Sequence, residues 1–295
     1  MTAADGQRYW GRYGAAGLLA HDAARGVLLQ HRVSWSDHGG TWGIPGGALH
    51  EHESAVDGAR RESLEEAGAP VAATSPMFCH VLDRGGWRYT TVVAEVTTPF
   101  EPSITDAESH ALAWAPVDTV ADYPLHPAFS ASWPLLRPLL GPRPAVVVDS
   151  ANVIGSVPDG WWKDRRGAQV RLRDRVAQLL GVGVAGGLLG FTQAAAPGIE
   201  RVFPHWILVG EGVARGVPSL PGVEVVDAPG LGDDTIIAET RRLLAEGRRV
   251  AVVTADEELR DRASAIGAVC RGPQKLLRQL PAEVIHDRRT PEVRA

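Results

Sequence analysis

The sequence predicts an α/β protein with two domains, on three observations. The chain has 295 residues, which is more than one domain usually needs. Prolines and glycines crowd residues 138–144, where neither a helix nor a sheet passes easily. Beyond that stretch, apolar β-branched runs alternate with helical patterns, which is typical of a parallel sheet with crossover helices. We expect domains at 1–143 and 144–285, followed by a polar tail at 286–295.

Hydrophobic periodicity places the elements of both halves. The strands expected in the first half are Ala15–Ala20, Gly26–Arg32, Phe78–Leu82, Arg88–Val96 and Ala111–Trp114. Its expected helices are Ser54–Ala67 and one within Pro127–Leu140. The strands expected in the second half are Ala145–Val148, Trp206–Val209, Val223–Val226 and Val250–Thr254. Its expected helices are Ala168–Leu180, Asp233–Glu246 and Glu257–Ile266.

Composition excludes several classes of protein. Hydrophobic residues make up 44% and charged residues 22% of the chain, which argues against wholesale disorder. A net charge of −5 excludes a uniformly basic nucleic-acid coat. Neither a membrane-length apolar run nor a signal-peptide pattern is present, so we expect no membrane partner. The two cysteines lie in different halves, which fits a reducing compartment, and we therefore expect a cytoplasmic protein.

Three glutamates share one face of the first expected helix. Ser54 can cap its start, and Gly68 can end it in the left-handed conformation. At about 100° per residue, Glu65 and Glu66 lie about 60° and 40° from Glu62 around the helix axis. The buried stripe is expected at Val56, Ala59, Ser63, Leu64 and Ala67. Clustered carboxylates repel each other unless a cation lies among them, and oxygen ligands suit Mg²⁺ or Mn²⁺.

This helix and the loop before it resemble the Nudix box of nucleoside-diphosphate-X hydrolases. The matching residues are Gly47, Glu53 and the run Arg61-Glu62-x-x-Glu65-Glu66-x-Gly68, all at the family spacing. Ser63 and Ala69 replace larger apolar residues, which affects the packing of the helix and leaves the charged positions unchanged. The resemblance covers about residues 12–140 and implies an α/β/α sandwich with a mixed sheet.

The resemblance implies Mg²⁺- or Mn²⁺-dependent hydrolysis of a nucleoside diphosphate linked to another moiety. The implied catalytic residues are Glu53, Arg61, Glu62, Glu65 and Glu66. The last three hold the metal, the arginine orients a glutamate through a salt bridge, and the first glutamate supports the loop or a ligand. Arg32, Gly46 and Gly47 are the expected substrate contacts.

The general base stays open between a box glutamate and one outside the box. Outside the box, the candidates are Glu95, Glu101 and Glu108. Trp87 and Tyr89 could stack a nucleobase, although aromatic residues that alternate on a strand usually serve packing.

In the second half, acidic residues lie at the ends of expected strands and at the start of an expected helix. Asp149 ends the first strand with Asn152 three residues later, Asp233 and Asp234 open a helix, and Asp256 follows a late strand. Because open α/β sheets gather ligand groups at the carboxyl ends of their strands, these side chains could meet in one crevice. Helix N-caps are the competing interpretation of the same residues.

The order of these motifs resembles the PIN-like/NYN nuclease superfamily over residues 144–282. That resemblance implies a doubly wound, mostly parallel α/β/α domain that cleaves RNA with Mg²⁺ or Mn²⁺. It implies that Asp149, Asp234 and Asp256 hold the metal, with Asn152 and Asp233 assisting. Whether Asp233 or Asp234 is the ligand stays open.

A basic stretch with tryptophans follows the first strand of this half. Trp161 and Arg166 lie in Gly160–Arg166, and stacking faces next to phosphate partners suit single-stranded RNA. A solvated helix with inward tryptophans is an equally good interpretation. His31, His38 and His126 have no spacing typical of metal ligands, so we expect them to serve turns or packing.

Two alternatives to a bifunctional enzyme stay open. The first is a nucleotide-sensing regulator, whose amino-terminal domain binds a nucleoside diphosphate derivative without turnover and whose second domain binds RNA. The second makes the carboxy-terminal half a non-cleaving RNA-binding module. The complete set of box glutamates disfavours the sensor, and the sequence leaves the oligomeric state undetermined.

Overall fold

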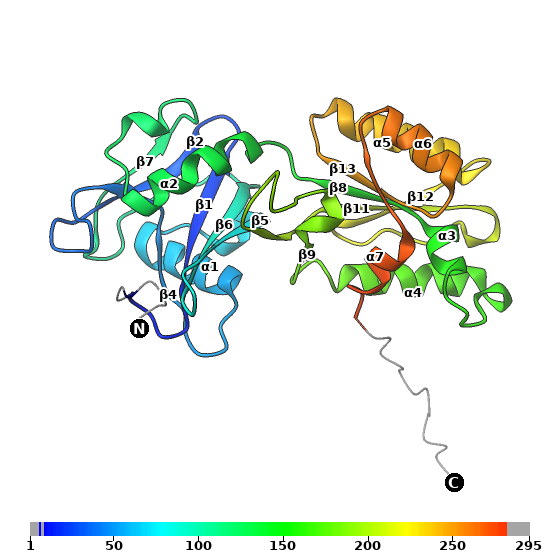
Figure 1. The fold of residues 1–295 in the computed structure, drawn as a ribbon, viewed down its shortest axis with the longest axis horizontal. Coiled ribbons are helices and arrows are strands. Elements are labelled where there is room, and N and C mark those ends of the chain that lie inside the picture. Colours follow the sequence, from blue (N-terminus) through cyan, green and yellow to red (C-terminus); the bar gives the residue numbers. More distant parts are fainter. Residues whose placement is uncertain (1–5, 7–8, 282–295) are drawn as a thin grey trace, which may run out of the picture.

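A computed structural model describes residue 6 and residues 9–281, and Figure 1 shows its arrangement. The expected polar tail at 286–295 lies outside these residues. Within the described part, the strands form two sheets, one of nine strands and one of five. No helix there is long and apolar enough to span a bilayer.

The first sheet is mixed, as expected. Its strands from the first half are β1 (Ala15–Asp22), β2 (Gly26–Arg32), β3 (Trp42–Gly43), β4 (Gly46–Ala48), β5 (Thr74–Asp83), β6 (Arg88–Val96) and β7 (Ser109–Ala115). Strand β1 pairs parallel with β6 and antiparallel with β2 and β4. All five expected strands are confirmed, and the sequence pattern missed β3 and β4 because two or three residues show no period.

Two helices cover opposite faces of this sheet (Figure 1). They are α1 (Ala55–Ala67) and α2 (Pro127–Leu136). Alternate residues of β1 face opposite ways, so Leu18 packs in the cluster that contains Ala59 of α1, whereas Leu19 packs with Trp133 of α2. The expected α/β/α layering of the first half is therefore present.

Helix α1 has the expected ends. The Ser54 hydroxyl accepts a hydrogen bond from the Asp57 amide, and Gly68 ends the helix with a φ of 60°. The expected buried position of Leu64 is wrong, because that side chain is 46% exposed. Leu64 lies about 100° around the axis from Ser63, the middle of the buried stripe, whereas Glu66 lies only about 60° from it. Glu66 is buried instead.

The second sheet is entirely parallel, in the order β12-β11-β8-β13-β14. Its strands are β8 (Ala145–Asp149), β11 (His205–Gly210), β12 (Val223–Asp227), β13 (Val250–Val253) and β14 (Val269–Arg271). Its helices are α3 (Ser150–Gly155), α4 (Arg165–Ala177), α5 (Gly232–Ala245), α6 (Glu257–Ala265) and α7 (Pro273–Leu277). Figure 1 shows α5 and α6 on one side of the sheet and α3, α4 and α7 on the other. The predicted parallel sheet is confirmed.

A hairpin from the second half joins the first sheet. Strands β9 (Val184–Ala185) and β10 (Ile199–Val202) pair with each other, and β10 pairs antiparallel with β5. Figure 1 shows β9 at the side of the first sheet that is nearer to the second half. The sequence pattern contained no sign of this pairing, because its partners lie more than 100 residues apart and β9 has only two residues.

Candidate functional site

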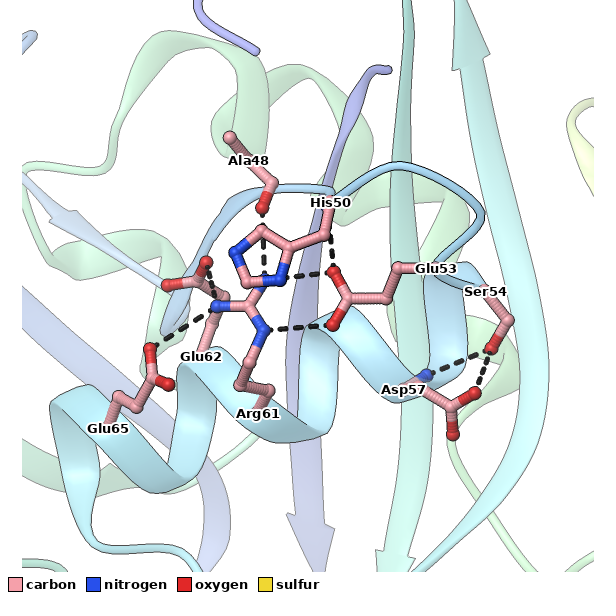
Figure 2. Close-up of polar contacts among 8 residues, drawn as sticks. All are labelled: Ala48, His50, Glu53, Ser54, Asp57, Arg61, Glu62 and Glu65. Carbon is pink, nitrogen blue, oxygen red and sulfur yellow. Dashed lines mark hydrogen bonds and ion pairs between the residues drawn. The ribbon is translucent and has the colours of Figure 1, made fainter. Parts of the chain in front are cut away.

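Arg61, in the middle of α1, is the centre of an ion network, which Figure 2 shows. Its guanidinium donates to both carboxylate oxygens of Glu53, at 2.8 and 2.9 Å. It also donates to Glu62 at 2.6 Å, to Glu65 at 3.2 Å and to the backbone carbonyl of Ala48 at 3.0 Å. One planar cation thus holds three box carboxylates and the loop before the helix in fixed positions.

Two glycines let β4 approach α1 closely. A Cβ atom at Gly47 would lie within 2.7 Å of the Glu62 carboxylate oxygens, and one at Gly46 would lie 2.4 Å from the backbone of Gly17. The Gly46 amide donates to Glu66 Oε2 at 2.8 Å. Gly47 requires glycine because the Glu62 carboxylate takes the space that a side chain would fill, and Gly46 requires it because the backbone of β1 does.

Two acidic residues from the segment just before β7 meet Glu66. Oxygen atoms of Glu66, Asp106 and Glu108 lie within 4.8 Å of one another. Burial is the largest cause that raises the pKa of Glu66 to about 8, and the nearby carboxylates of Asp106, Glu62 and Glu108 contribute to the same rise against the opposing hydrogen bond from Gly46. Asp106 Oδ1 is buried without a hydrogen-bond partner among the described residues.

This arrangement fits a hard divalent cation. The donors are carboxylate oxygens, one of which has no partner, and their mutual repulsion raises a pKa that a bound cation would lower. Glu62 and Glu65 come from the same helix as Glu66, but Glu65 points outward with 57% of its side chain exposed. Sequence reasoning missed Asp106, since no motif contains it.

The structure separates the three general-base candidates outside the box. Glu95 pairs with Arg143 at 2.8 Å, and Glu101 pairs with Arg25 at 3.2 Å. Glu108 lies with Glu66. Among these three, Glu108 is therefore the one that reaches the box carboxylates.

The aromatic candidates of the first half serve packing. Trp87 stacks on Tyr9 with ring centroids 4.3 Å apart and donates its indole N–H to the Trp10 carbonyl. A Cβ atom at Gly17 would lie 2.3 Å from the Tyr89 hydroxyl, so Tyr89 lies tightly against β1. Arg32, an expected substrate contact, donates from Nε to the Asp37 carbonyl at 3.1 Å.

In the second half, acidic side chains meet at the carboxyl edge of the parallel sheet. A cavity of about 190 Å³ is lined by nine residues, namely Asp149, Ala151, Asn152, Val209, Glu211, Gly232, Asp233, Ile236 and Asp256. Strand β8 separates the two wings of the sheet, so the cavity lies where the strand order reverses, the usual ligand position in such sheets.

Hydrogen bonds orient the members of this cavity. Asp149 accepts from the Asn152 amide at 3.0 Å and from the Thr254 hydroxyl at 2.8 Å. Asn152 in turn accepts from the Ala255 amide at 2.9 Å. Burial, together with the charges of Asp233 and Glu211, raises the pKa of Asp149 despite these hydrogen bonds. Asp149 therefore both caps α3 and lines the cavity.

The structure distinguishes the adjacent aspartates that open α5. Asp233 lines the cavity, and its pKa is raised by burial and then by the charge of Asp256. Asp234 points away, 79% exposed, and pairs with Arg262 at 2.6 Å. Glu211, which sequence reasoning missed, lines the same cavity and accepts from the Gly232 amide at 2.9 Å. It follows β11, so its position after a strand was the available signal.

Arginines of the basic stretch and of α4, which follows it, make internal contacts. Arg166 donates to the Gly216 carbonyl at 2.8 Å, and Arg173 donates to the Pro218 carbonyl at 2.8 Å. Arg165 lies over the Trp161 ring at 5.3 Å, whereas Trp162 is largely exposed. The structure therefore gives Arg166 a role in holding α4 to the loop before β12.

A family model and several known proteins are similar to part of this chain. Residues 11–137 match the family model of the NUDIX domain. A candidate 8-oxo-dGTP diphosphatase 3 of Mycobacterium tuberculosis is 49% identical over 143 residues, 45% of this chain and 65% of that protein. A nucleoside triphosphate pyrophosphatase/Nudix hydrolase fusion protein of Bifidobacterium longum is 41% identical over 142 residues, 45% of this chain and 30% of that protein.

A crystal structure of the Nudix hydrolase RenU from M. smegmatis is 42% identical and covers 47% of this chain and 91% of that one, with a TM-score of 0.44. The chain spans less than two thirds of the length of the curated relatives named above. The family match spans the residues of the box described above. The amino-terminal region of this chain is therefore a Nudix domain.

Proposed function

We propose that the Nudix domain hydrolyses a phosphoric anhydride bond in a nucleoside diphosphate linked to another moiety, with Mg²⁺ or Mn²⁺. The single observation that carries this proposal is the convergence of Glu66, Asp106 and Glu108, with one buried carboxylate oxygen left without a partner. A bound divalent ion would polarise the phosphate and lower the pKa of a water molecule. The named Nudix relatives support the same reaction class.

Each box residue has a task in this proposal. Glu62, Glu65 and Glu66 hold the metal together with Asp106 and Glu108. Arg61 fixes the positions of Glu62 and Glu65 through its hydrogen bonds and ties them to the loop through Glu53. Gly46 and Gly47 keep the strand close to the carboxylates, and Gly46 orients Glu66. Arg32 remains our proposed contact for the substrate.

A modified purine nucleoside triphosphate is the first substrate to test. The M. tuberculosis relative is named for 8-oxo-dGTP, which is a nucleoside diphosphate linked to phosphate. A panel of nucleoside triphosphates and nucleotide sugars, assayed with the full chain, would identify the preferred class.

The test of the activity is Glu66→Gln. We expect kcat/KM to fall by roughly 100-fold or more, because the variant removes a charge from the centre of the ligand set. Glu101→Gln is the matched control, since Glu101 lies in a salt bridge with Arg25. Product release at the wild-type rate in Glu66→Gln would refute the assignment. Tight nucleotide binding by wild-type protein without turnover would favour the nucleotide-sensing regulator.

We propose, as a second function, that the carboxy-terminal half is a PIN-like/NYN domain that cleaves single-stranded RNA with Mg²⁺ or Mn²⁺. The cavity that gathers Asp149, Glu211, Asp233 and Asp256 at the carboxyl edge of a parallel sheet supports this proposal. The pKa values of Asp149 and Asp233 are raised in this group of four carboxylates. Such a group suits a hard cation, which would stabilise charge on a phosphodiester. Trp161 and Trp162 are the proposed stacking faces for bases.

Adjacent aspartates provide the test of this second activity. We expect Asp233→Asn to lose Mn²⁺-dependent cleavage of single-stranded RNA by roughly 100-fold, because Asp233 lines the cavity. Asp234→Asn should lose far less, since Asp234 points outward toward Arg262. Equal losses in the two variants would contradict the proposed geometry. RNA binding without any cleavage in purified wild-type protein would favour a non-cleaving binding module.

A further inference from the structure

A second group of metal-ligating side chains lies on the Nudix domain, formed by Asp37, His38 and His126. One ligating atom from each lies within 4.8 Å of the other two. His126 Nε2 is 3.8 Å from Asp37 Oδ2, and the two imidazole rings meet edge to face with centroids 4.8 Å apart. The sequence separates the two histidines by 88 positions (126 − 38), which is why their spacing suggested no joint role.

The loop between β2 and β3 holds the first two residues in place. The Gly40 amide donates to the Arg32 carbonyl at 3.0 Å, and Arg32 Nε donates to the Asp37 carbonyl at 3.1 Å. The Thr41 hydroxyl donates to the His38 carbonyl at 2.6 Å. His38 has a φ of 49°, a left-handed conformation that few residues other than glycine adopt. The loop is therefore tied down around a residue in an uncommon conformation.

The third residue is positioned by the start of α2. The His126 amide donates to the Trp42 carbonyl at 2.7 Å, and the Trp42 amide donates to the Pro124 carbonyl at 2.8 Å. The end of the β2–β3 loop and the start of α2 are thus both anchored on Trp42. A Cβ atom at Gly43 would lie 3.8 Å from His126 Cβ, so the base of the His126 side chain lies next to β3.

We propose that Asp37, His38 and His126 form a binding site for a borderline divalent transition cation of the Zn²⁺ class. Two imidazole nitrogens and one carboxylate oxygen are the ligands that such ions prefer, whereas Mg²⁺ prefers an all-oxygen set. Asp37 and His38 are exposed, so water can complete the coordination. The site thus differs in ligand chemistry from the carboxylates of the Nudix box.

Binding has one defined cost in this geometry. His126 Nδ1 accepts a hydrogen bond from the Ala128 amide at 3.2 Å, which places the proton of the neutral ring on Nε2. A cation bound at Nε2 moves that proton to Nδ1 and removes the cap from α2. Ala128 is exposed, so water can replace the acceptor, and the loss is limited to one helix cap.

A bound cation would cross-link the β2–β3 loop to α2. His126, the N-cap residue of α2, would then be joined to the loop by a metal bridge in addition to its ion pair with Asp37. Arg32 lies at the base of the same loop. Occupancy would therefore be expected to reduce the mobility of the loop that follows this proposed substrate contact.

Zinc titration of the full chain in a large excess of Mg²⁺ tests the site, since Mg²⁺ saturates the carboxylate set. Bound Zn²⁺ is measured by competition with a chromophoric chelator. We expect one Zn²⁺ per chain in wild-type protein and at least a tenfold loss of affinity in both His38→Asn and His126→Asn. Asparagine tolerates the left-handed conformation at position 38 and can cap a helix at position 126, so both variants should fold.

His52→Asn is the matched control, because His52 is exposed and also has a positive φ, of 65°. Its Zn²⁺ affinity should equal that of the wild type. Absence of Zn²⁺ binding in excess Mg²⁺ would overturn the proposal, and so would unchanged affinity in the His38 and His126 variants. As a second readout, Co²⁺ absorption bands that disappear in His38→Asn but persist in His52→Asn would support nitrogen ligation at this group.

Discussion

Arg61 satisfies acceptors on four different residues with a single guanidinium. Its planar fork takes both oxygens of Glu53 while the third nitrogen reaches Glu62 and Glu65. The shared hydrogen bonds hold the pKa of Glu53 at about 2, against its ordinary 4.5, and raise the pKa of Arg61. A lysine at this position would supply a point charge without the fork, so it could not hold the same set of carboxylates.

The Glu53–Arg61 pair predicts a defined acid dependence of stability. A carboxyl whose pKa is lower in the folded than in the unfolded protein stabilises the fold above its ordinary pKa and loses that effect as it becomes protonated. We expect the difference in unfolding free energy between wild type and Glu53→Gln to be constant above pH about 5. It should shrink as the pH falls from about 4.5 toward about 2. Urea unfolding at a series of pH values measures it, and a difference that grows on acidification would contradict the prediction.

The ends of helix α1 are set by residues next to them in the sequence, whereas its orientation is set by packing against the sheet. Ser54 caps its first turn and Gly68 ends it, while Ala59, Ser63 and Ala67 form the stripe that packs on the sheet. The same packing turns Glu66 toward β4 and leaves Leu64 exposed. The carboxylates of this helix therefore lie in two environments: Glu66 is buried, whereas Glu62 and Glu65 accept hydrogen bonds from Arg61.

Removal of the N-cap of α1 should cost stability without changing the site chemistry. We expect Ser54→Ala to lower the unfolding free energy by about 1 kcal/mol, because the Asp57 amide loses its acceptor. Ser54→Asn keeps an acceptor and should stay within a few tenths of a kcal/mol of the wild type. Chemical denaturation of the three proteins tests this, and equal stability of Ser54→Ala and wild type would count against a role for the cap.

At the scale of the whole molecule, the two halves share backbone hydrogen bonds and a hydrophobic core. Strand β10 extends the Nudix sheet at β5, and one continuous core cluster contains both Phe78 of the first half and Trp206 of the second. Arg143 ties the halves together through Glu95 and through the carbonyls of Pro76 and Phe203. The halves are therefore expected to unfold as one cooperative unit.

A substitution at Gly198 tests this coupling. Its φ is +78°, and a Cβ atom there would lie 2.8 Å from His80 and from the Val81 carbonyl. We expect Gly198→Val to lower the unfolding free energy by about 2 kcal/mol or more, since it strains the backbone and separates β10 from β5. Gly187→Ala, where a Cβ atom meets nothing within 4 Å, is the control. Two separate unfolding transitions in wild-type protein would contradict the single cooperative unit.

The sequence by itself determined the elements whose cause is local. The cap at Ser54, the end of α1 at Gly68 and the apolar strands of the parallel sheet follow from residue types at short spacing. The glutamates of the box and the aspartates next to strand ends were visible for the same reason. The position of a residue within a helix or strand indicates which face its side chain takes, and the pattern that shows this spans only a few neighbouring residues.

Tertiary structure decided which of these residues meet. Asp106 and Glu108 join Glu66, and Glu211 joins Asp149, across stretches of chain whose length no periodic pattern encodes. The choice between Asp233 and Asp234 depended on how α5 packs, because adjacent helical residues point about 100° apart. The joining of β10 to β5 has the same origin: long-range pairing depends on complementary surfaces formed by the folded chain, and a single sequence carries no local signal for them.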